Sequence, residues 1–178
     1  MEQKDYKSEI VGLLLKERYH IRGLAKKLDT NHMIVVRKIR ELAKSNVVDF
    51  VQEGKNKTYF LKKTAEAKVY VFMAENYKLI QTLTRYPALR GIVERIQKDK
   101  KIGLAILFGS YAKGLAIKNS DIDIYIETKN RSLKKELQLI DSKLSIKIGE
   151  YDKESPLIQE IEKNHVIIKG VEGYYEKL

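Results

Sequence analysis

The segment between residues 109 and 123 concentrates the residue types that phosphoryl chemistry needs. Gly109 and Ser110 follow an apolar run, and Asp121 and Asp123 come later, inside an alternation of isoleucines. This alternation predicts a strand that carries both aspartates on one face. Two adjacent carboxylates suit a hard cation such as magnesium, and the backbone N–H groups of a Gly-Ser turn suit phosphate oxygens. The pattern therefore predicts a site for metal-assisted phosphoryl or nucleotidyl transfer.

The order of these residues resembles the signature of the nucleotidyltransferase superfamily of DNA polymerase beta and kanamycin nucleotidyltransferase, in its small prokaryotic branch. An apolar strand, Gly-Ser, a short helix and Ser-Asp-Ile-Asp on a second strand follow one another within residues 88–170. The resemblance implies that Asp121 and Asp123 are catalytic carboxylates that hold magnesium. It also implies a group of residues that bind a nucleoside triphosphate: Gly109, Ser110, Lys113 and Ser120.

The chain departs from the family pattern at a third carboxylate, which the family carries on a later strand. The strand predicted over 144–151 places Lys147 at about that position. Glu150 lies on the opposite face of that strand unless a bulge intervenes, and Glu127 lies ~13 Å beyond Asp123 along the strand of the two aspartates. The fold prediction is unaffected, but whether the domain transfers nucleotides or only binds them stays open.

Composition narrows the class of protein further. The 178-residue chain contains no cysteine, which excludes disulfides and thiolate zinc sites. Its histidines, His20, His32 and His165, lack the spacing of metal ligands. No run approaches the ~20 apolar residues of a membrane span, and the first residues lack the apolar stretch of a secretion signal. We therefore expect a cytoplasmic protein.

The net charge of +11 is unevenly distributed along the chain. Residues 1–65 hold 15 Lys and Arg against 8 Asp and Glu, a net of +7. A concentrated basic region is typical of a nucleic-acid partner, although the same excess spread over a surface can serve solubility alone.

The pattern within that basic region resembles a winged helix-turn-helix over about residues 5–63. Apolar residues at helical spacing are followed by two strand-like segments around a polar turn. The three helices and two strands are expected at 7–18, 21–28, 31–45, 47–52 and 58–61. In this motif the third helix enters the major groove and the wing contacts the backbone.

The resemblance implies two groups of DNA contacts. Asn31, His32 and Arg37 could reach base edges. Arg40, Lys55 and Lys57 suit phosphates. For each residue alone, a solvated helix face is an equally good interpretation, but motif, charge and wing together favour binding of duplex DNA. A winged helix used as a protein–protein module is the other possibility.

An amphipathic segment over 64–86 predicts a long helix that ends before Pro87. This helix packs either against a flanking domain or against a second copy of the chain. We favour dimerisation slightly, because winged-helix proteins usually bind paired half-sites as dimers.

Together these patterns predict an α+β chain of two domains. The expected parts are a winged helix-turn-helix at 1–63, a connecting or dimerisation helix at 64–86, and a minimal nucleotidyltransferase-like α/β domain with a small mixed sheet at 87–178. Within the last part we expect helices over 131–144, with Ile140 facing inward, and over 156–164.

Two functions are compatible with this organisation. The first is a DNA-binding protein that binds a magnesium–nucleoside triphosphate and transfers a nucleoside monophosphate to a hydroxyl. The resemblance then implies an antitoxin-like role beside a helical toxin-type protein. The second is a non-catalytic transcriptional regulator, in which the domain senses nucleotide or mediates assembly.

Overall fold

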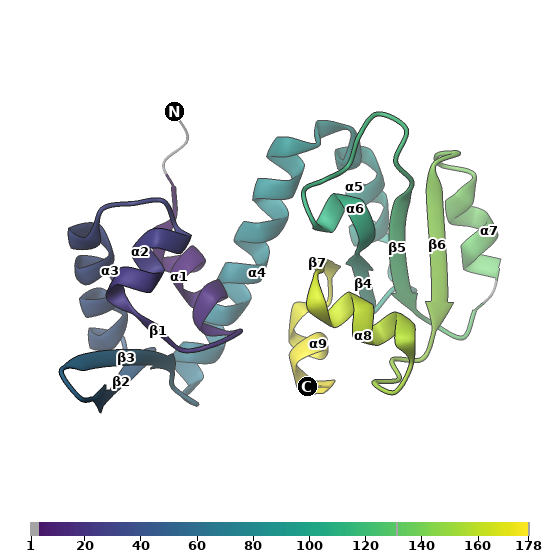
Figure 1. The fold of residues 1–178 in the computed structure, drawn as a ribbon. Coiled ribbons are helices and arrows are strands. Elements are labelled where there is room, and N and C mark those ends of the chain that lie inside the picture. The colour runs from purple at the N-terminus through teal and green to yellow at the C-terminus, as the bar shows by residue number, and fades with distance from the viewer. Residues whose placement is uncertain (1–3, 131, 178) are drawn as a thin grey trace. The chain divides into compact units, whose positions relative to one another are not determined.

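A computed structural model of the chain describes residues 4–130 and 132–177. Its internal contacts divide the chain into two compact units, Met1–Tyr77 and Lys78–Leu178 (Figure 1). The first unit contains α1 (Tyr6–Leu14), β1 (Tyr19–His20), α2 (Ile21–Lys27), α3 (His32–Lys44), β2 (Val48–Glu53), β3 (Asn56–Leu61) and the first part of α4 (Ala65–Arg85). This order of helices and strands confirms the winged helix.

Side-chain capping and apolar spacing explain α1 and α3. Asp5 caps α1, because its carboxylate accepts hydrogen bonds from the backbone N–H groups of Lys7 and Ser8 at 3.1 and 3.3 Å. Buried residues recur at helical spacing on α1 and α3: Ile10, Val11 and Leu14, then Val35, Ile39 and Leu42.

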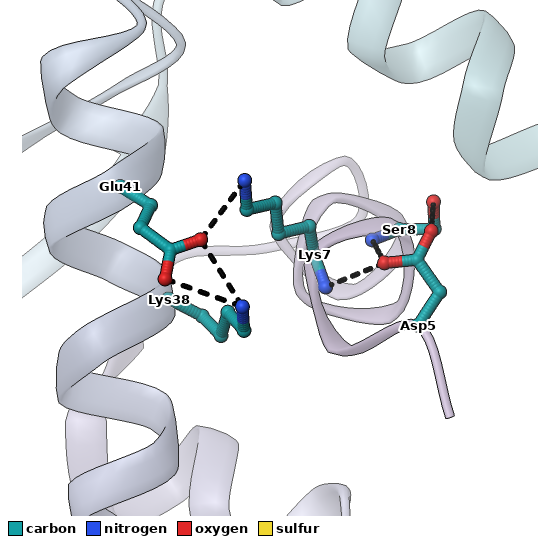
Figure 2. Close-up of polar contacts among 5 residues, drawn as sticks. All are labelled: Asp5, Lys7, Ser8, Lys38 and Glu41. Carbon is teal, nitrogen blue, oxygen red and sulfur yellow. Dashed lines mark hydrogen bonds and ion pairs between the residues drawn. The ribbon is translucent and has the colours of Figure 1, made fainter. Parts of the chain in front are cut away.

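Glu41 of α3 forms ion pairs with two lysines (Figure 2). Its carboxylate lies 2.9 Å from Lys7 Nζ of α1 and 3.1 Å from Lys38 Nζ of α3 itself. The hydrogen bonds from Lys7 and Lys38 hold the pKa of Glu41 below its ordinary value. The pair between Lys7 and Glu41 therefore links α1 to α3 at the surface.

The wing has one strand more than the hairpin that the sequence predicts. β2 and β3 pair antiparallel from Val48↔Leu61 to Glu53↔Asn56, and β1 pairs with β3 through Tyr19↔Tyr59. The sheet order is β1-β3-β2. A two-residue strand is too short to show an alternation of apolar and polar residues, so the sequence does not predict β1.

A long single helix, α4, covers most of the predicted segment 64–86 and ends just before Pro87. It contributes residues to both units. Ala67 and Val71 are buried in its first part, whereas Leu79 belongs to the apolar core of the second unit and Leu83 packs against that core.

The second unit is built on a four-stranded mixed sheet of order β6-β5-β4-β7. β4 runs antiparallel to β5 and β7, and β5 runs parallel to β6. Its elements after α4 are η1 (Pro87–Leu89), α5 (Arg90–Lys98), β4 (Leu104–Leu107), α6 (Gly109–Ala112), β5 (Ile122–Glu127), α7 (Ser132–Gln138), β6 (Leu144–Gly149), α8 (Pro156–Lys163), β7 (Val166–Lys169) and α9 (Val171–Lys177).

Helices cover both faces of this sheet (Figure 1). On one face, α5 and α7 pack on the isoleucines of β5, as Ile96 and Leu137 do. On the other face, α8 and α9 pack on Tyr125 through Ile161 and Tyr174. The sequence predicts the isoleucine face correctly, but Tyr125, which shares the face of Asp121 and Asp123, is also buried.

The helix predicted over 131–144 is shorter than expected, and Ile140 is exposed rather than inward. The reason is a turn at Asp141, whose carboxylate accepts from the Lys143 N–H at 2.8 Å and whose carbonyl accepts from the Leu144 N–H at 3.1 Å. These bonds replace the helical ones. Among the described residues, no helix has the length and apolarity needed to cross a membrane.

Candidate nucleotide site and candidate DNA-binding surface

The antiparallel pairing of β4 and β5 brings the Gly-Ser turn to the aspartates. Leu107, the last residue of β4, pairs with Ile124, and the Phe108 N–H donates to the carbonyl of Asp123 at 2.9 Å. Gly109 therefore lies directly beside Asp123. Within the strand alternation Asp121 is exposed and Asp123 is partly buried on the same face.

Gly109 makes room for the carboxylate of Asp123. The glycine has φ +68°, and a β-carbon added to it would lie 2.4 Å from Asp123 Oδ2. Any side chain at this position would displace that carboxylate, and a positive φ is also unfavourable for any residue with a β-carbon. The structure thus places one acidic oxygen against the first residue of α6.

Helix α6 is short and ends in a Schellman motif. The Gly114 N–H donates to the Tyr111 carbonyl at 3.1 Å, and the Leu115 N–H donates to the Ser110 carbonyl at 2.9 Å. Gly114 has the left-handed φ of +70° that this motif requires. The motif stops the helix after one turn, so the chain returns toward β5 through the loop that carries Ser120.

Lys113 lies four residues after Gly109, on the same side of α6. Its Nζ is 2.7 Å from Glu160 Oε1 of α8. The hydrogen bond from Lys113 holds the pKa of Glu160 below its ordinary value. The predicted phosphate ligand is therefore ion-paired with an acidic residue that the sequence analysis does not single out, since the two are distant in the chain.

Ser120 has a structural contact in the loop after α6. Its hydroxyl accepts the Ile117 N–H at 2.9 Å, and its own N–H donates to the Ile117 carbonyl at 3.0 Å. This pair of bonds closes a turn just before Asp121. Ser120 therefore positions the chain just before β5.

The loop also lies against a cation from α4. A β-carbon added to Gly114 would be 2.5 Å from Arg85 Nη1, so the guanidinium packs on the glycine. The neighbouring Tyr86 and Tyr111 rings meet edge to face, with centroids 4.9 Å apart. The sequence gives no signal for Arg85, because 64–86 is interpreted there as a connecting or dimerisation helix rather than as part of the site.

The register of β5 and β6 shows which residue of β6 lies beside Asp123. Asp123 pairs with Ser145, whereas Lys147 pairs with Tyr125, one pair further along. Neighbouring strands lie ~4.8 Å apart, so the residue beside Asp123 is Ser145, and Lys147 lies one same-face position further along β6. Ser145 and Lys147 lie on the same face of β6, so the alternation of the sequence alone cannot distinguish them.

The two alternative carboxylates lie at the far end of the sheet. Glu127 pairs with Gly149 at the end of β5 and forms an ion pair with Lys177 at 2.9 Å. Glu150 follows that pair and contacts Lys129 at 2.8 Å. No group of three or more metal-ligating side chains forms within residues 4–130 and 132–177.

The predicted DNA contacts of α3 divide into one capping residue and exposed cations. Asn31 is the N-cap of α3, and its side-chain oxygen accepts the Met33 N–H at 2.7 Å. His32, Arg37 and Arg40 are exposed on the same helix. The two arginines line a shallow hollow of about 470 Å³ along the face of α3, together with Met33, Ile34, Val36, Glu41 and Lys44.

The predicted contacts of the wing lie at its tip and on its central strand, β3. Lys55 is exposed in the turn between β2 and β3. Lys57 is exposed on β3, and its Nζ lies 3.9 Å from the centre of the Phe50 ring. A cation–π contact of this kind holds the ammonium near the surface of the sheet without neutralising its charge.

Comparison with known proteins supports the assignment of the second unit. A family model described as "Polymerase beta, Nucleotidyltransferase" matches residues 90–171. No curated protein matches the chain.

Similar solved structures include an adhesin competence repressor from Streptococcus pyogenes, with 18% identity, 51% of this chain and 68% of that chain covered, and a TM-score of 0.42. The transcriptional repressor BigR from Xylella fastidiosa has 14% identity, coverages of 48% and 76%, and a TM-score of 0.36. A structure titled a toxin-antitoxin with AMP-PNP has 26% identity, coverages of 54% and 73%, and a TM-score of 0.32.

The first unit is a winged helix, defined by the order of its helices and its three-stranded sheet. The second unit carries a nucleotidyltransferase domain, and residues 90–171 match the polymerase beta family.

Proposed function

We propose that this chain is a DNA-binding protein whose nucleotidyltransferase domain binds a magnesium–nucleoside triphosphate. The observation that carries the proposal is the packing of the Asp123 carboxylate on Gly109, which joins the acidic strand to the Gly-Ser turn. Asp121, Asp123 and the start of α6 then lie at one end of the sheet. Gly109, Ser110 and Lys113 are proposed as phosphate ligands.

The donor set fits magnesium, because this ion commonly binds to one or two carboxylates and completes its shell with waters and substrate phosphates. Asp121 and Asp123 would hold it. When bound, magnesium would neutralise charge on the triphosphate. Lys113 would bind a terminal phosphate after leaving Glu160, and the exchange is inexpensive because exposed ion pairs contribute little.

Transfer requires that a hydroxyl oxygen bond to the α-phosphorus, that the α–β bridging bond break with release of pyrophosphate, and that a base accept the hydroxyl proton. Ser145 beside Asp123 cannot be that base, and its neutral hydroxyl adds no charge to the metal site. We therefore propose that the domain binds nucleotide and transfers slowly or not at all. The lack of a carboxylate beside Asp123 favours the second candidate function, a regulator that senses nucleotide.

The first unit is proposed to bind duplex DNA. The exposed His32, Arg37 and Arg40 on α3, and Lys55 and Lys57 on the wing, support this proposal. Asn31 is instead proposed to act mainly as a helix cap.

The proposal also includes assembly with other protein chains. Val69, Met73 and Ile80 are exposed on α4, which supports a homodimer built partly on that helix. By resemblance of the motif, we also propose a separate toxin-type partner protein.

The test of the nucleotide proposal is calorimetric titration of nucleoside triphosphate with and without magnesium. We expect binding that requires magnesium and that Asp123→Asn weakens at least about tenfold, the effect of losing ~1.4 kcal/mol. Glu94→Gln, on the exposed face of α5, should change nothing. Magnesium-independent binding, or full binding by Asp123→Asn, would refute the proposal.

A further inference from the structure

An exposed methionine, Met33, lies in the first turn of α3 on the side of the helix that faces away from the core. Its exposed fraction is 66%, whereas Val35, Ile39 and Leu42 occupy the opposite, buried side. A single exposed apolar side chain is common on protein surfaces and by itself indicates no function. Met33 differs from such a residue in the company it keeps along the helix.

Three cationic residues share the exposed side of α3 with Met33. Arg37, Arg40 and Lys44 follow it at steps of four, three and four residues, a spacing that brings all four side chains to one side of a helix. The same four residues line the shallow hollow of about 470 Å³ on α3, and the three cations are exposed. The row therefore begins with an apolar side chain and continues with positive charge.

This side of α3 is basic even though Glu41 also lines the hollow. The Glu41 carboxylate lies 2.9 Å from Lys7 Nζ and 3.1 Å from Lys38 Nζ, so two ammonium groups offset its charge (Figure 2). A basic surface that also contains an apolar side chain is complementary to duplex DNA. Phosphates flank the major groove, and the C5-methyl group of each thymine projects into it.

The place of Met33 in α3 favours contact with bases over contact with phosphates. In helix-turn-helix proteins, the first residues of the recognition helix contact the base edges. Hydrogen bonds to Asn31 hold this turn, because its side-chain oxygen accepts the Met33 N–H at 2.7 Å and its carbonyl accepts the Ile34 N–H at 3.1 Å. A side chain on a backbone that is already held loses less conformational entropy when it binds.

We propose that Met33 determines specificity by contacting the C5-methyl group of a thymine in the major groove. This inference rests on the proposed binding of duplex DNA by the first unit, and it adds which chemical group of a base is recognised there. The thymine methyl is the apolar group that base edges offer in this groove, and an unbranched, polarizable methionine adapts its shape to such a contact. Arg37, one turn further along, is suited to guanine. The preferred site should therefore combine thymine with guanine.

The test begins with selection of duplexes from a randomised library by the full chain at low salt. Each thymine of a selected duplex is then replaced by uracil, which keeps the base pair and removes only the methyl group. We expect one or two positions where this replacement weakens binding about fourfold, the effect of one buried methyl group. Met33→Ala should bind the thymine and uracil duplexes equally. Fluorescence anisotropy measures each affinity.

Leu139→Ala is the matched control, because Leu139 is an apolar residue of the second unit with an exposed fraction of 88%. This variant should keep the fourfold difference between thymine and uracil. Circular dichroism confirms that both variants are folded.

A difference between thymine and uracil that persists in Met33→Ala would overturn the inference, because it would then arise from DNA shape or from another residue. Selected duplexes in which no thymine can be replaced with loss of affinity would also overturn it, as would binding without sequence preference. These outcomes leave DNA binding by the first unit intact. If no duplex binds even at low salt, the proposed DNA-binding function fails, and the inference fails with it.

Discussion

The carboxylate of Asp123 occupies the space that a β-carbon of residue 109 would need, with its Oδ2 only 2.4 Å from that position. Two elements separated by a helix and a loop are thus packed at the distance that a glycine alone permits. This contact makes the site sensitive to the addition of one carbon atom at residue 109.

Gly109→Ala should destabilise the second unit and weaken nucleotide binding together. The left-handed backbone conformation costs ~1–2 kcal/mol for a residue with a β-carbon, and displacement of Asp123 adds to that. Urea denaturation measures the loss of stability. Gly91→Ala in α5 is the matched control, since a β-carbon there meets nothing within 4 Å, and it should stabilise by up to ~1 kcal/mol. Unchanged nucleotide affinity in Gly109→Ala would contradict our account of the site.

Ser145→Asp should restore a third carboxylate beside Asp123. We expect tighter magnesium binding and a rise in nucleotidyl transfer, because a missing general base typically costs ~10²–10⁴-fold in rate. Incorporation of label from an α-labelled nucleoside triphosphate measures this. Lys147→Asp is the control, one pair further along the strand, and should give the smaller gain. A larger gain from Lys147→Asp would show that the site uses a different register.

Substitutions on the first unit should separate base contacts from phosphate contacts. Lys55→Ala should lower affinity similarly for all duplexes and reduce the salt slope of binding by ~1. Arg37→Ala should instead reduce the preference among sequences. Fluorescence anisotropy over a salt series measures both effects, and binding that ignores salt would exclude the proposed interface.

Asn31→Ala is expected to act through stability rather than through DNA. Loss of an N-cap costs ~0.5–2 kcal/mol, and the oxygen of Asn31 already accepts the Met33 N–H. Denaturation should show this cost, whereas Asn31→Asp should retain the cap. A normal stability combined with altered sequence preference would instead restore Asn31 to the base-contacting group.

The ion pairs of Glu41 predict a pH dependence of the free energy of unfolding. The pKa of Glu41 is lowered from 4.5 in the folded chain, so its contribution is present above about pH 4.5 and is lost as the pH falls through the lower folded pKa. The pKa of Lys7 is raised from 10.5, so that part is lost only in strongly basic solution. The stability difference between the unmodified chain and Glu41→Gln should therefore shrink on acidification, and added salt should reduce it too. A difference independent of pH would show that the pairs contribute nothing.

The proposed dimer depends on apolar residues of α4, of which Met73 is exposed and Phe72 is partly buried. Replacing Phe72 and Met73 with glutamate should give monomers that bind DNA more weakly, because paired half-sites need both copies. Sedimentation at micromolar concentration compares the two proteins. If the unmodified chain sediments as a monomer, the dimer is refuted.

Local pattern was enough to predict the acidic strand and the winged helix. Alternating isoleucines reveal the face of Asp121 and Asp123, and helical spacing reveals Val35, Ile39 and Leu42. The partner of Asp123 was not predictable in this way. Ser145 and Lys147 have the same parity, and only the long-range register of β5 with β6 selects between them.

Other errors have equally specific causes. Ile140 continues the helical spacing of α7, but the side chain of Asp141 competes with the helix and ends it early. The Lys113–Glu160 pair joins segments far apart in the chain, and no local signal marks it. Sequence reasoning was most reliable where one element determines the outcome and least reliable where two distant elements must meet.

The continuity of α4 restricts how this protein can be divided for experiment. Leu79 and Leu83 belong to the core of the second unit, yet they precede the segment that the family model matches. A fragment that begins at residue 90 would lack both side chains and would expose the apolar surface that they cover. We expect such a fragment to express poorly, whereas one that begins at residue 78 would retain the complete core.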